Sequence, residues 1–211
     1  MRLLNRRWFL YAATPLAAAS TGIWAAARGP EPDLISSTCA GADQMPRKIL
    51  IAYATRAGST AKVADAIARR LCDAGLRAEV RPVAEVEPLD DYDGAVLGSA
   101  IRFAAWLPGM IGCLDANRRR LAEMPVAVFT MHMLALGDDP AAMAERAKYT
   151  AKARDLVTPV EEVFFEGMID LARLSFLDRL AVRLVKSPIG DRRNWQRIET
   201  WATGLATRLV T

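Results

Sequence analysis

The chain contains little histidine and little cysteine. His132 is the only histidine, and Cys39, Cys72 and Cys113 stand far apart in a chain of 211 residues. Protein metal sites need several clustered ligands, and disulfide frameworks show closely spaced cysteines. The sequence therefore predicts neither a metal centre nor a disulfide framework. Cys72 and Cys113 fall on helical patterns, so we interpret them as small core residues.

A large excess of charge is also missing from most of the chain. The formal net charge is +4, and Arg2, Arg6 and Arg7 near the N-terminus account for three of these charges, which leaves +1 for the rest. No basic patch is interleaved with aromatic residues, as nucleic-acid binding would require. We expect no nucleic acid among the partners.

Residues 1–27 have the pattern of an export signal. Arg6 and Arg7 precede Phe9-Leu10, which resembles the twin-arginine signal, and residues 8–27 carry no charge. The small residues at 25–27 suit cleavage by a signal peptidase. We predict export by the twin-arginine route to the periplasm or cell envelope. The alternative is an uncleaved membrane anchor through residues 8–27, because about 20 apolar residues can cross a bilayer.

A linker is expected at residues 28–46, followed by one domain at 47–211. Pro30, Pro32, Gly41 and Pro46 interrupt the linker, which has no periodic pattern. The remaining length is sufficient for a single domain with a substantial core.

The domain opens with a strand, a loop and a helix. Ile49–Ala54 is an apolar run typical of a strand buried on both faces, and residues 60–74 follow a helical period that ends before Gly75. The loop between them, Thr55-Arg-Ala-Gly-Ser-Thr60, is rich in hydroxyl groups around Gly58. Backbone N–H groups and the helix dipole make such a loop suitable for a phosphate. The alternative is an ordinary helix start capped by Ser59 or Thr60.

The later segments alternate between strand and helix patterns. This alternation predicts an α/β fold with a doubly wound, five-stranded parallel sheet in the order 2-1-3-4-5 and a C-terminal helix. The second strand, which ends at Pro82, is expected at the sheet edge. The predicted segments are strands at 76–82, 93–99, 125–130 and 160–165, and helices at 108–121, 140–155 and 195–209.

Three loops should meet at the carboxyl ends of the central strands, where ligands bind in such sheets. They are Thr55–Thr60, Ser99–Trp106 and Thr130–Asp138. The second and third loops are unusually apolar, which suits a planar ring between them. The alternative is that the third loop simply tucks into the core. His132 lies in the third loop, and we do not assign it as a general base because no partner for it is evident.

At this point the residues resemble a known family. The loop Thr55–Thr60 and the segment Tyr92–Phe103, with its turn Gly-Ser-Ala-Ile-Arg-Phe, resemble the flavodoxin superfamily. More narrowly, they are similar to the branch that contains menaquinone-dependent protoporphyrinogen IX dehydrogenase. Residues 165–179 and 190–193 add to this similarity, which covers about residues 48–209.

The resemblance implies FMN as the cofactor. It places the phosphate on the first loop and the isoalloxazine ring between the other two. The residues implied are Thr55, Arg56, Ala57, Gly58, Ser59 and Thr60 for the phosphate, and Ser99, Ala100, Ile101, Arg102, Phe103, Met131, His132 and Met133 for the ring.

The resemblance also implies an FMN-dependent oxidoreductase that passes electrons to or from a quinone or a redox protein. Arg56 and Arg102 stand where electron-carrier flavodoxins have an acidic surround, and a nearby cation favours two-electron reduction. Two alternatives are an FMN electron carrier without its own substrate and a non-redox binding module on the same fold. A phospho-receiver domain is disfavoured because Ser99 and its neighbours include no aspartate at the end of the third strand.

Residues 171–186 form a basic amphipathic segment. Apolar residues recur on one side, and Arg173, Arg179, Arg183 and Lys186 supply positive charge. We expect a helix packed on the sheet with a solvated charged face. The alternative is peripheral membrane contact through this segment.

Overall fold

The computed structural model describes residues 29–40 and 45–209. The predicted twin-arginine signal at 1–27 and the alternative anchor at 8–27 lie outside the described residues. Within the described ranges, no helix combines the length and the apolar character needed to span a bilayer. The chain divides into two compact units. The larger contains Pro32–Asp170 and Pro188–Thr211, and the smaller contains Leu171–Ser187 with the described residues 29–31.

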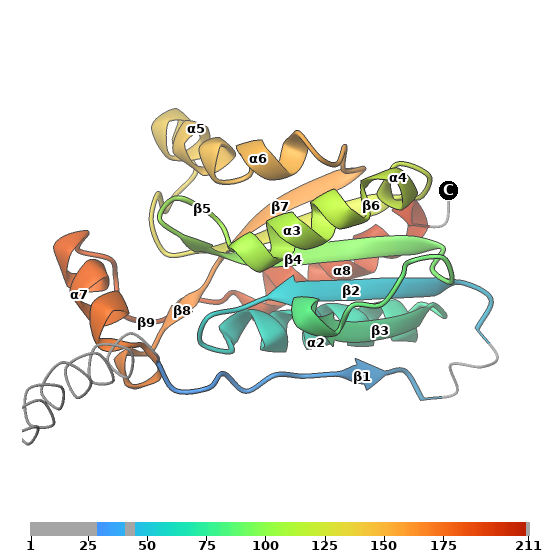
Figure 1. Cartoon of the computed structure of the whole chain (residues 1–211), viewed down its shortest axis with the longest axis horizontal. Coiled ribbons are helices and arrows are strands. Elements are labelled where there is room, and N and C mark those ends of the chain that lie inside the picture. The colour runs from blue at the N-terminus through green and yellow to red at the C-terminus, as the bar shows by residue number, and fades with distance from the viewer. Residues whose placement is uncertain (1–28, 41–44, 210–211) are drawn as a thin grey trace, which may run out of the picture. The chain divides into compact units, whose positions relative to one another are not determined.

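A parallel sheet forms the centre of the larger unit (Figure 1). Its five parallel strands stand in the order β3-β2-β4-β6-β7, which is the predicted order 2-1-3-4-5. The α/β fold class is therefore confirmed. Two short strands extend this sheet, β1 beside β3 and β5 beside β4. The bounds are β1 Ser37–Thr38, β2 Lys48–Ala54, β3 Arg77–Pro82, β4 Gly94–Arg102, β5 Ala105–Trp106, β6 Val126–His132 and β7 Glu161–Glu166.

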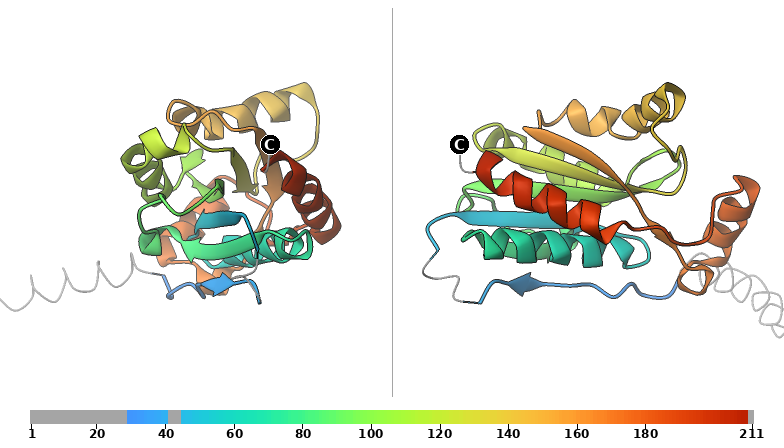
Figure 2. Two further views of the ribbon diagram at one scale, coloured as in Figure 1. Left: turned by 90° about the vertical axis from the view of Figure 1, so that its right-hand side faces the viewer. Right: turned by 180° about the vertical axis from the view of Figure 1, so that it is seen from behind.

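Helices cover both faces of the sheet (Figure 2). One face packs against α2 (Ser59–Asp73) and α8 (Trp195–Arg208). The other packs against α3 (Pro108–Ala116), α4 (Arg118–Leu121) and α6 (Ala151–Arg154), and α5 (Pro140–Tyr149) precedes α6. The two long helices predicted at 108–121 and 140–155 are therefore each divided in two.

The side chains of β2 explain why its sequence is apolar throughout. Ile49, Ile51 and Tyr53 lie in the core beside α2 and α8, whereas Leu50 and Ala52 lie in the opposite core. Successive side chains of a strand point to opposite faces, so a strand covered on both sides has no polar face.

Gly98 on β4 serves this close packing. A Cβ atom there would stand 1.9 Å from the ring of Phe129, its register partner on β6. Only glycine leaves room for this ring in the core.

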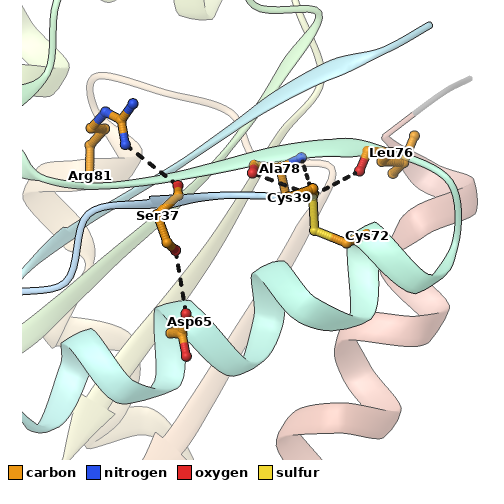
Figure 3. Close-up of a disulfide and its surroundings, with 7 residues drawn as sticks. All are labelled: Ser37, Cys39, Asp65, Cys72, Leu76, Ala78 and Arg81. Carbon is orange, nitrogen blue, oxygen red and sulfur yellow. Dashed lines mark hydrogen bonds between the residues drawn. A yellow bond between two sulfur atoms is a disulfide. The ribbon is translucent and has the colours of Figure 1, made fainter. Parts of the chain in front are cut away.

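The segment 32–39 gives the first correction to the sequence-based predictions. We predicted an unpatterned linker here and an exposed edge at β3, but β1 pairs antiparallel with β3 through Ser37↔Val80 and Thr38↔Glu79. Cys39, just after β1, forms a disulfide with Cys72 near the end of α2, with the Cα atoms 5.9 Å apart (Figure 3). Our interpretation of Cys72 as a free core residue is wrong. Cys113 is free and half-buried, as expected, and burial raises the pKa of its thiol.

The disulfide escaped prediction because its cysteines are 33 residues apart in sequence. Spacing rules detect local cysteine patterns, and nothing local to Cys39 or Cys72 reveals the strand pairing that brings them together. The sulfur of Cys39 also lies 3.4 Å from the Leu76 carbonyl oxygen, and the backbone N–H of Ala78 donates to it at 3.1 Å.

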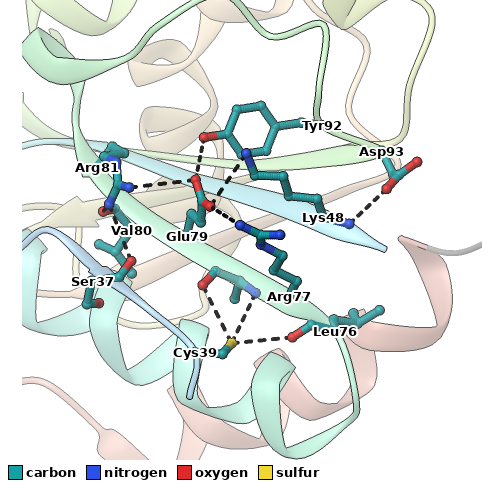
Figure 4. Close-up of polar contacts among 11 residues, drawn as sticks. Ser37, Cys39, Lys48, Leu76, Arg77, Glu79, Val80, Arg81, Tyr92 and Asp93 are labelled. Carbon is teal, nitrogen blue, oxygen red and sulfur yellow. Dashed lines mark hydrogen bonds and ion pairs between the residues drawn. The ribbon is translucent and has the colours of Figure 1, made fainter. Parts of the chain in front are cut away.

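A cluster of charges surrounds the buried carboxylate of Glu79 on β3 (Figure 4). The Tyr92 hydroxyl donates to it at 2.8 Å, and Lys48, Arg77 and Arg81 lie 3.4–3.7 Å from its oxygens. Burial acts to raise the pKa of Glu79, but the Tyr92 hydrogen bond and the charges of Lys48 and Arg81 outweigh it, so the pKa is lowered. Glu79 therefore stays ionised within the protein at neutral pH.

The smaller unit contains a 3-10 turn (Leu171–Arg173) and the helix α7 (Phe176–Leu184). Ser175 caps α7, because its hydroxyl accepts from the Asp178 N–H at 3.1 Å and donates to the Asp178 carboxylate at 2.7 Å. None of the residues of α7 is buried. Both the packing of this segment on the sheet and its contact with a membrane stay predictions.

The C-terminal part of the chain returns to the larger unit. The strands β8 (Met168–Ile169) and β9 (Gly190–Asp191) pair antiparallel, and α8 follows. The predicted C-terminal helix is confirmed, and its apolar residues Ile198 and Leu205, with the following Leu209, are buried. Trp195 differs, with 37% of its surface exposed.

Candidate functional site

Three loops begin side by side at one edge of the sheet. The last residue of β2, Ala54, is in register with Ser99 on β4, and Ser99 is in register with Thr130 on β6. The chain leaves β2 at this level, whereas β4 and β6 continue to Arg102 and His132 before their loops begin. All three loops follow the carboxyl ends of neighbouring parallel strands. This is the position at which open α/β sheets bind ligands.

The first loop, 55–60, is shaped by Gly58. Its φ of 86° lies in the left-handed region, and its N–H donates to the Thr55 hydroxyl oxygen at 3.0 Å. Gly58 is also the N-cap of α2, and no side chain in the described part of the chain caps this helix. Our alternative of a helix start capped by Ser59 or Thr60 is thus wrong. Arg56 is exposed at the loop tip, and Thr55 and Ala57 are half-buried.

Thr60 offers a hydrogen-bond donor at this helix start. Its side chain is fully buried, and its hydroxyl oxygen has no hydrogen-bond partner among the residues that the structure describes. Burying an unpaired hydroxyl group is costly, so native proteins usually satisfy such groups. By contrast, Asp139 and Asn194 cap α5 and α8 with their side chains. An uncapped helix start with an unpaired hydroxyl fits the phosphate of FMN.

Arg193 lies beside the same helix start, and sequence reasoning did not assign it to the site. Its Nη1 atom is 3.5 Å from the Ser59 carbonyl oxygen, and its guanidinium lies over the Trp195 ring at 4.6 Å. Asp191 holds it through Nε at 2.8 Å, and this hydrogen bond is the main cause of the lowered pKa of Asp191. The Arg193 side chain is only 5% exposed. The family resemblance of residues 190–193 is the one signal in the sequence that points to Arg193.

The second loop is a tight hairpin between β4 and β5. Ile101 pairs with Trp106 and Arg102 with Ala105, so Phe103 and Ala104 form a two-residue turn with φ values of 51° and 56°. Positive φ at two successive non-glycine residues is costly, and such conformations gather at functional sites. The turn presents the Phe103 ring, which is 78% exposed, with the Arg102 guanidinium 4.7 Å from its centroid.

Buried hydrogen bonds fix the base of this hairpin. The Ser99 hydroxyl donates to the Ala100 carbonyl oxygen at 2.8 Å and accepts from the Leu107 N–H at 3.0 Å. The Trp106 indole N–H donates to the Thr130 hydroxyl oxygen at 2.9 Å. Ser99 therefore shapes the loop through its side chain. The bond between Trp106 and Thr130 links the second loop to the third, and our sequence reasoning missed it.

Met131 and His132, which we predicted in the third loop, are the last two residues of β6, and the loop begins at Met133. Met131 packs in the core beside α2 and α8, whereas His132 packs between the rings of Tyr149 and Phe164. The structure therefore places both side chains among packed residues, while the half-buried Met133 begins the connection.

The environment of His132 keeps its imidazole neutral. It is 4% exposed, and burial is the main cause of a pKa lowered below 6.5. In the neutral ring, Nδ1–H donates to the Leu134 carbonyl oxygen, 2.8 Å away. This bond shapes the third loop.

Tyr53, near the end of β2, connects the first loop to the segment 32–39 through hydrogen bonds. Its hydroxyl accepts from the Ile35 N–H at 2.7 Å and donates to the Ile35 carbonyl oxygen at 3.1 Å. Tyr53 stands two residues before Thr55, at the end of β2. Its pKa is raised, chiefly by burial.

Comparisons with known proteins agree with this arrangement. A family model described as a flavodoxin domain matches residues 50–194. Protoporphyrinogen IX dehydrogenase [quinone] from Escherichia coli K12 is 24% identical over 173 residues, which cover 75% of this chain and 94% of that protein. The protein of the same name from Leishmania major is 28% identical over 154 residues, covering 71% of this chain and 66% of that protein.

Two solved structures share the fold. A flavodoxin variant from Pseudomonas aeruginosa aligns with a TM-score of 0.51 at 16% identity, over 78% of this chain and 99% of that one. The rubredoxin oxygen:oxidoreductase from Desulfovibrio gigas aligns with a TM-score of 0.50 at 16% identity and covers 80% of this chain. The chain spans only 37% of the length of that larger protein.

Proposed function

Because the chain belongs to the flavodoxin domain family and so binds FMN, we propose that it is an oxidoreductase that passes electrons to or from a quinone or a redox protein. The observation that carries this proposal is the uncapped start of α2 with the unpaired buried hydroxyl of Thr60. The names of the curated relatives support the quinone as partner.

The first loop would hold the FMN phosphate. The left-handed Gly58 lets the backbone turn closely around an anion, and the Thr60 hydroxyl would donate to a phosphate oxygen. The Thr55 hydroxyl oxygen accepts from the Gly58 N–H and so keeps the loop in this shape. Helix N-termini favour bound anions through their unpaired N–H groups and dipole. Arg193 positions the helix start from the side through the Ser59 carbonyl.

The second and third loops would hold the ring. The hairpin presents Phe103 and Arg102 at the same sheet edge, and the neutral His132 fixes the start of the third loop through Leu134. When bound, FMN supplies exchange of two electrons between a donor and an acceptor. The residues of these loops would orient the ring, limit access of water and place one positive charge near it. His132 is assigned no proton transfer, because its ring is buried and packs beside the rings of Tyr149 and Phe164.

The cofactor and its acceptor are tested in one purified sample. Heat should release a flavin that chromatography identifies as FMN, and a chain that yields FAD, or no flavin after reconstitution, contradicts the proposal. The reduced holoprotein is then mixed with a soluble menaquinone analogue. We expect rapid reoxidation of the flavin absorbance by the quinone. Reoxidation by a redox protein alone would favour the electron-carrier alternative.

We also propose that the chain is exported by the twin-arginine route to the periplasm or cell envelope. The disulfide between Cys39 and Cys72 supports this proposal, because structural disulfides persist in oxidising compartments. A flavoprotein exported by this route would leave the cytoplasm folded around its cofactor.

The route is tested by changing Arg6 and Arg7 together to lysine. This keeps the charge but removes the guanidinium geometry. We expect the variant to remain in the cytoplasm and its Cys39 and Cys72 to react with an alkylating reagent. Normal export of the variant would contradict the proposal, and an unprocessed N-terminus in the envelope would identify the alternative anchor.

A further inference from the structure

The smaller unit carries an exposed apolar face that FMN binding does not explain. We call Phe176, Leu177, Leu180 and Leu184 the α7 face. These side chains are 46–73% exposed. Their spacing of one, four and eight residues places them within a sector of roughly 100° on the helix. A cluster of large exposed apolar residues on a short helix marks a surface that meets another apolar phase.

Basic residues lie along the flank of this face. Arg179 and Arg183 stand one and two turns beyond Phe176, and Lys186 follows the helix. Residues 171–187 contain four basic residues and one acidic residue, so their net charge is +3. The acidic residue, Asp178, is tied to the cap at Ser175. Long basic side chains beside an apolar face can reach lipid phosphates while the face enters the acyl region.

The helix is held in shape without using the α7 face. Ser175 caps its start, and the Arg179 Nε–H donates to the Leu174 carbonyl oxygen at 3.1 Å. Leu174 is 9% exposed, so the chain just before α7 is packed. Gly29 lies so close to this point that a Cβ atom on it would stand 2.9 Å from the Ser175 nitrogen. The start of α7 is thus held by contacts of Leu174 and Ser175, and the apolar residues of the α7 face stay exposed.

We propose that the α7 face inserts into the interface of an anionic membrane, with Arg179, Arg183 and Lys186 contacting the lipid phosphates. The combination of apolar exposure and one sign of charge selects a lipid surface, because neither feature alone gives stable binding. A quinone dissolved in the bilayer would then be close to the protein. This last link rests on the proposed function, whereas the membrane contact does not.

The test reports on α7 itself in the full chain. Cys113 is changed to alanine, and an environment-sensitive fluorophore is attached to Leu184→Cys or, as control, to Met143→Cys on α5. Met143 is an apolar residue that is 55% exposed in the larger unit. With phosphatidylglycerol vesicles we expect a blue shift at position 184 and none at 143. Vesicles of phosphatidylcholine should give a weaker shift.

Charge reversal tests the basic flank. Arg183→Glu changes two charges and should lower the vesicle partition coefficient of the 184 signal roughly 30-fold, whereas Arg119→Glu on α4 should not. Added salt should weaken the signal as well. No shift with any vesicle would overturn the proposal. A blue shift at 184 before vesicles are added would also overturn it, because the face would then be covered by the N-terminal residues or by a second copy.

The flavin spectrum of the same labelled samples separates this proposal from the proposed function. A membrane shift without bound FMN would leave the membrane contact standing and contradict the oxidoreductase. Bound FMN without a fluorescence shift on vesicles would leave the oxidoreductase standing and contradict the membrane contact.

Discussion

Two regions at opposite ends of α2 are built on contrasting principles. At its start, residues 29–40 and 45–209 supply neither a side-chain cap for the helix nor a hydrogen-bond partner for the Thr60 hydroxyl. Near its end, Cys72 is bonded to Cys39, and the segment 32–39 covers the edge of β3. In the first region, hydrogen-bond donors at the start of α2 stay available for a ligand, and this lowers the stability of the ligand-free protein. In the second region, the segment 32–39 and the disulfide cover the edge of β3 and raise the stability.

The two regions nevertheless share one connection. The segment 32–39 reaches the Tyr53 hydroxyl through Ile35, and Tyr53 immediately precedes the loop edge. A change at the disulfide could therefore act on cofactor binding through β2, or the two ends could be energetically separate. Substitutions at each region decide between these cases, and we expect separate ends.

The largest expected effect is the loss of the disulfide. Changing Cys39 and Cys72 together to serine should lower the free energy of unfolding by about 3–4 kcal/mol, because a bridge over this loop length restricts the unfolded chain. Denaturant unfolding of the FMN-free protein measures this change. FMN affinity should stay within about twofold, which is less than 1 kcal/mol.

Cys113→Ser is the matched control, because Cys113 is free and only half-buried. It should change the free energy of unfolding much less. A large loss of FMN affinity in the disulfide variant, absent in this control, would show that the two ends of α2 are coupled.

The next effect concerns the charge cluster beneath the covered edge. Glu79→Gln leaves Lys48, Arg77 and Arg81 facing one another without their carboxylate. We expect a loss of about 2–3 kcal/mol in the free energy of unfolding at pH 7. Glu123→Gln, which affects an exposed pair with Arg120, should cost less than about 1 kcal/mol.

The pH dependence of this loss has a definite sign. The pKa of Glu79 is lowered in the folded protein, so its contribution is present above the unfolded carboxyl pKa and is lost as the pH falls through the folded value. The difference between the wild-type protein and Glu79→Gln should therefore shrink in acid, below about pH 4.5. If the difference in the free energy of unfolding stays constant down to pH 3, the negative charge of Glu79 does not cause it.

Thr60→Val should change stability and binding in opposite directions. It replaces an unpaired buried hydroxyl with a methyl group of similar size, so the FMN-free protein should gain up to about 1 kcal/mol in stability. FMN binding should weaken by about 1–3 kcal/mol through the lost hydrogen bond to a charged group. Unfolding without FMN and a flavin titration measure the two effects.

Thr203→Val is the control, because its exposed hydroxyl donates only to the Glu199 carbonyl within α8. It should leave FMN binding unchanged. Lower stability of Thr60→Val without FMN would show that the Thr60 hydroxyl already has a partner, such as water.

The contrast between the two regions also explains what the sequence could predict. The strand, loop and helix at 48–75 announce themselves by local periodicity and by Gly58, so their positions and the order of the parallel strands were predictable. The pairing of β1 with β3 and the disulfide were not, because each joins segments far apart in sequence with no local pattern. The segment 32–39 is held partly by single contacts such as that between Ile35 and Tyr53.

Within the site, sequence identified loops better than it identified contacts. It placed Ser99 and His132 correctly at the carboxyl edge, but their polar atoms serve their own loops. Arg193 comes from a segment more than 130 residues after the first loop, and only the tertiary fold brings it to Ser59. Side-chain roles of this kind depend on packing that periodicity does not encode.

The smallest expected effect concerns Arg102, and it tests the cofactor edge through charge. At the covered edge, the cations surround a carboxylate, so their charges are largely balanced. At the cofactor edge, Arg102 lies over the Phe103 ring, and a positive charge near FMN favours its reduced, more negative form. Arg102→Leu should lower the two-electron potential by about 30 mV, which equals about 1.4 kcal/mol.

Redox titration of the purified holoprotein measures this shift, and two variants separate charge from packing. Phe103→Leu removes the ring beneath the guanidinium but keeps the charge, so it should shift the potential less. Arg119→Leu removes a charge from α4, outside the three loops, and should leave the potential unchanged. An unchanged potential in Arg102→Leu with FMN still bound would mean that its charge does not act on the ring. The preference for two-electron chemistry would then lose its main physical support, because residues 99–106 and 130–138 contain no arginine or lysine besides Arg102.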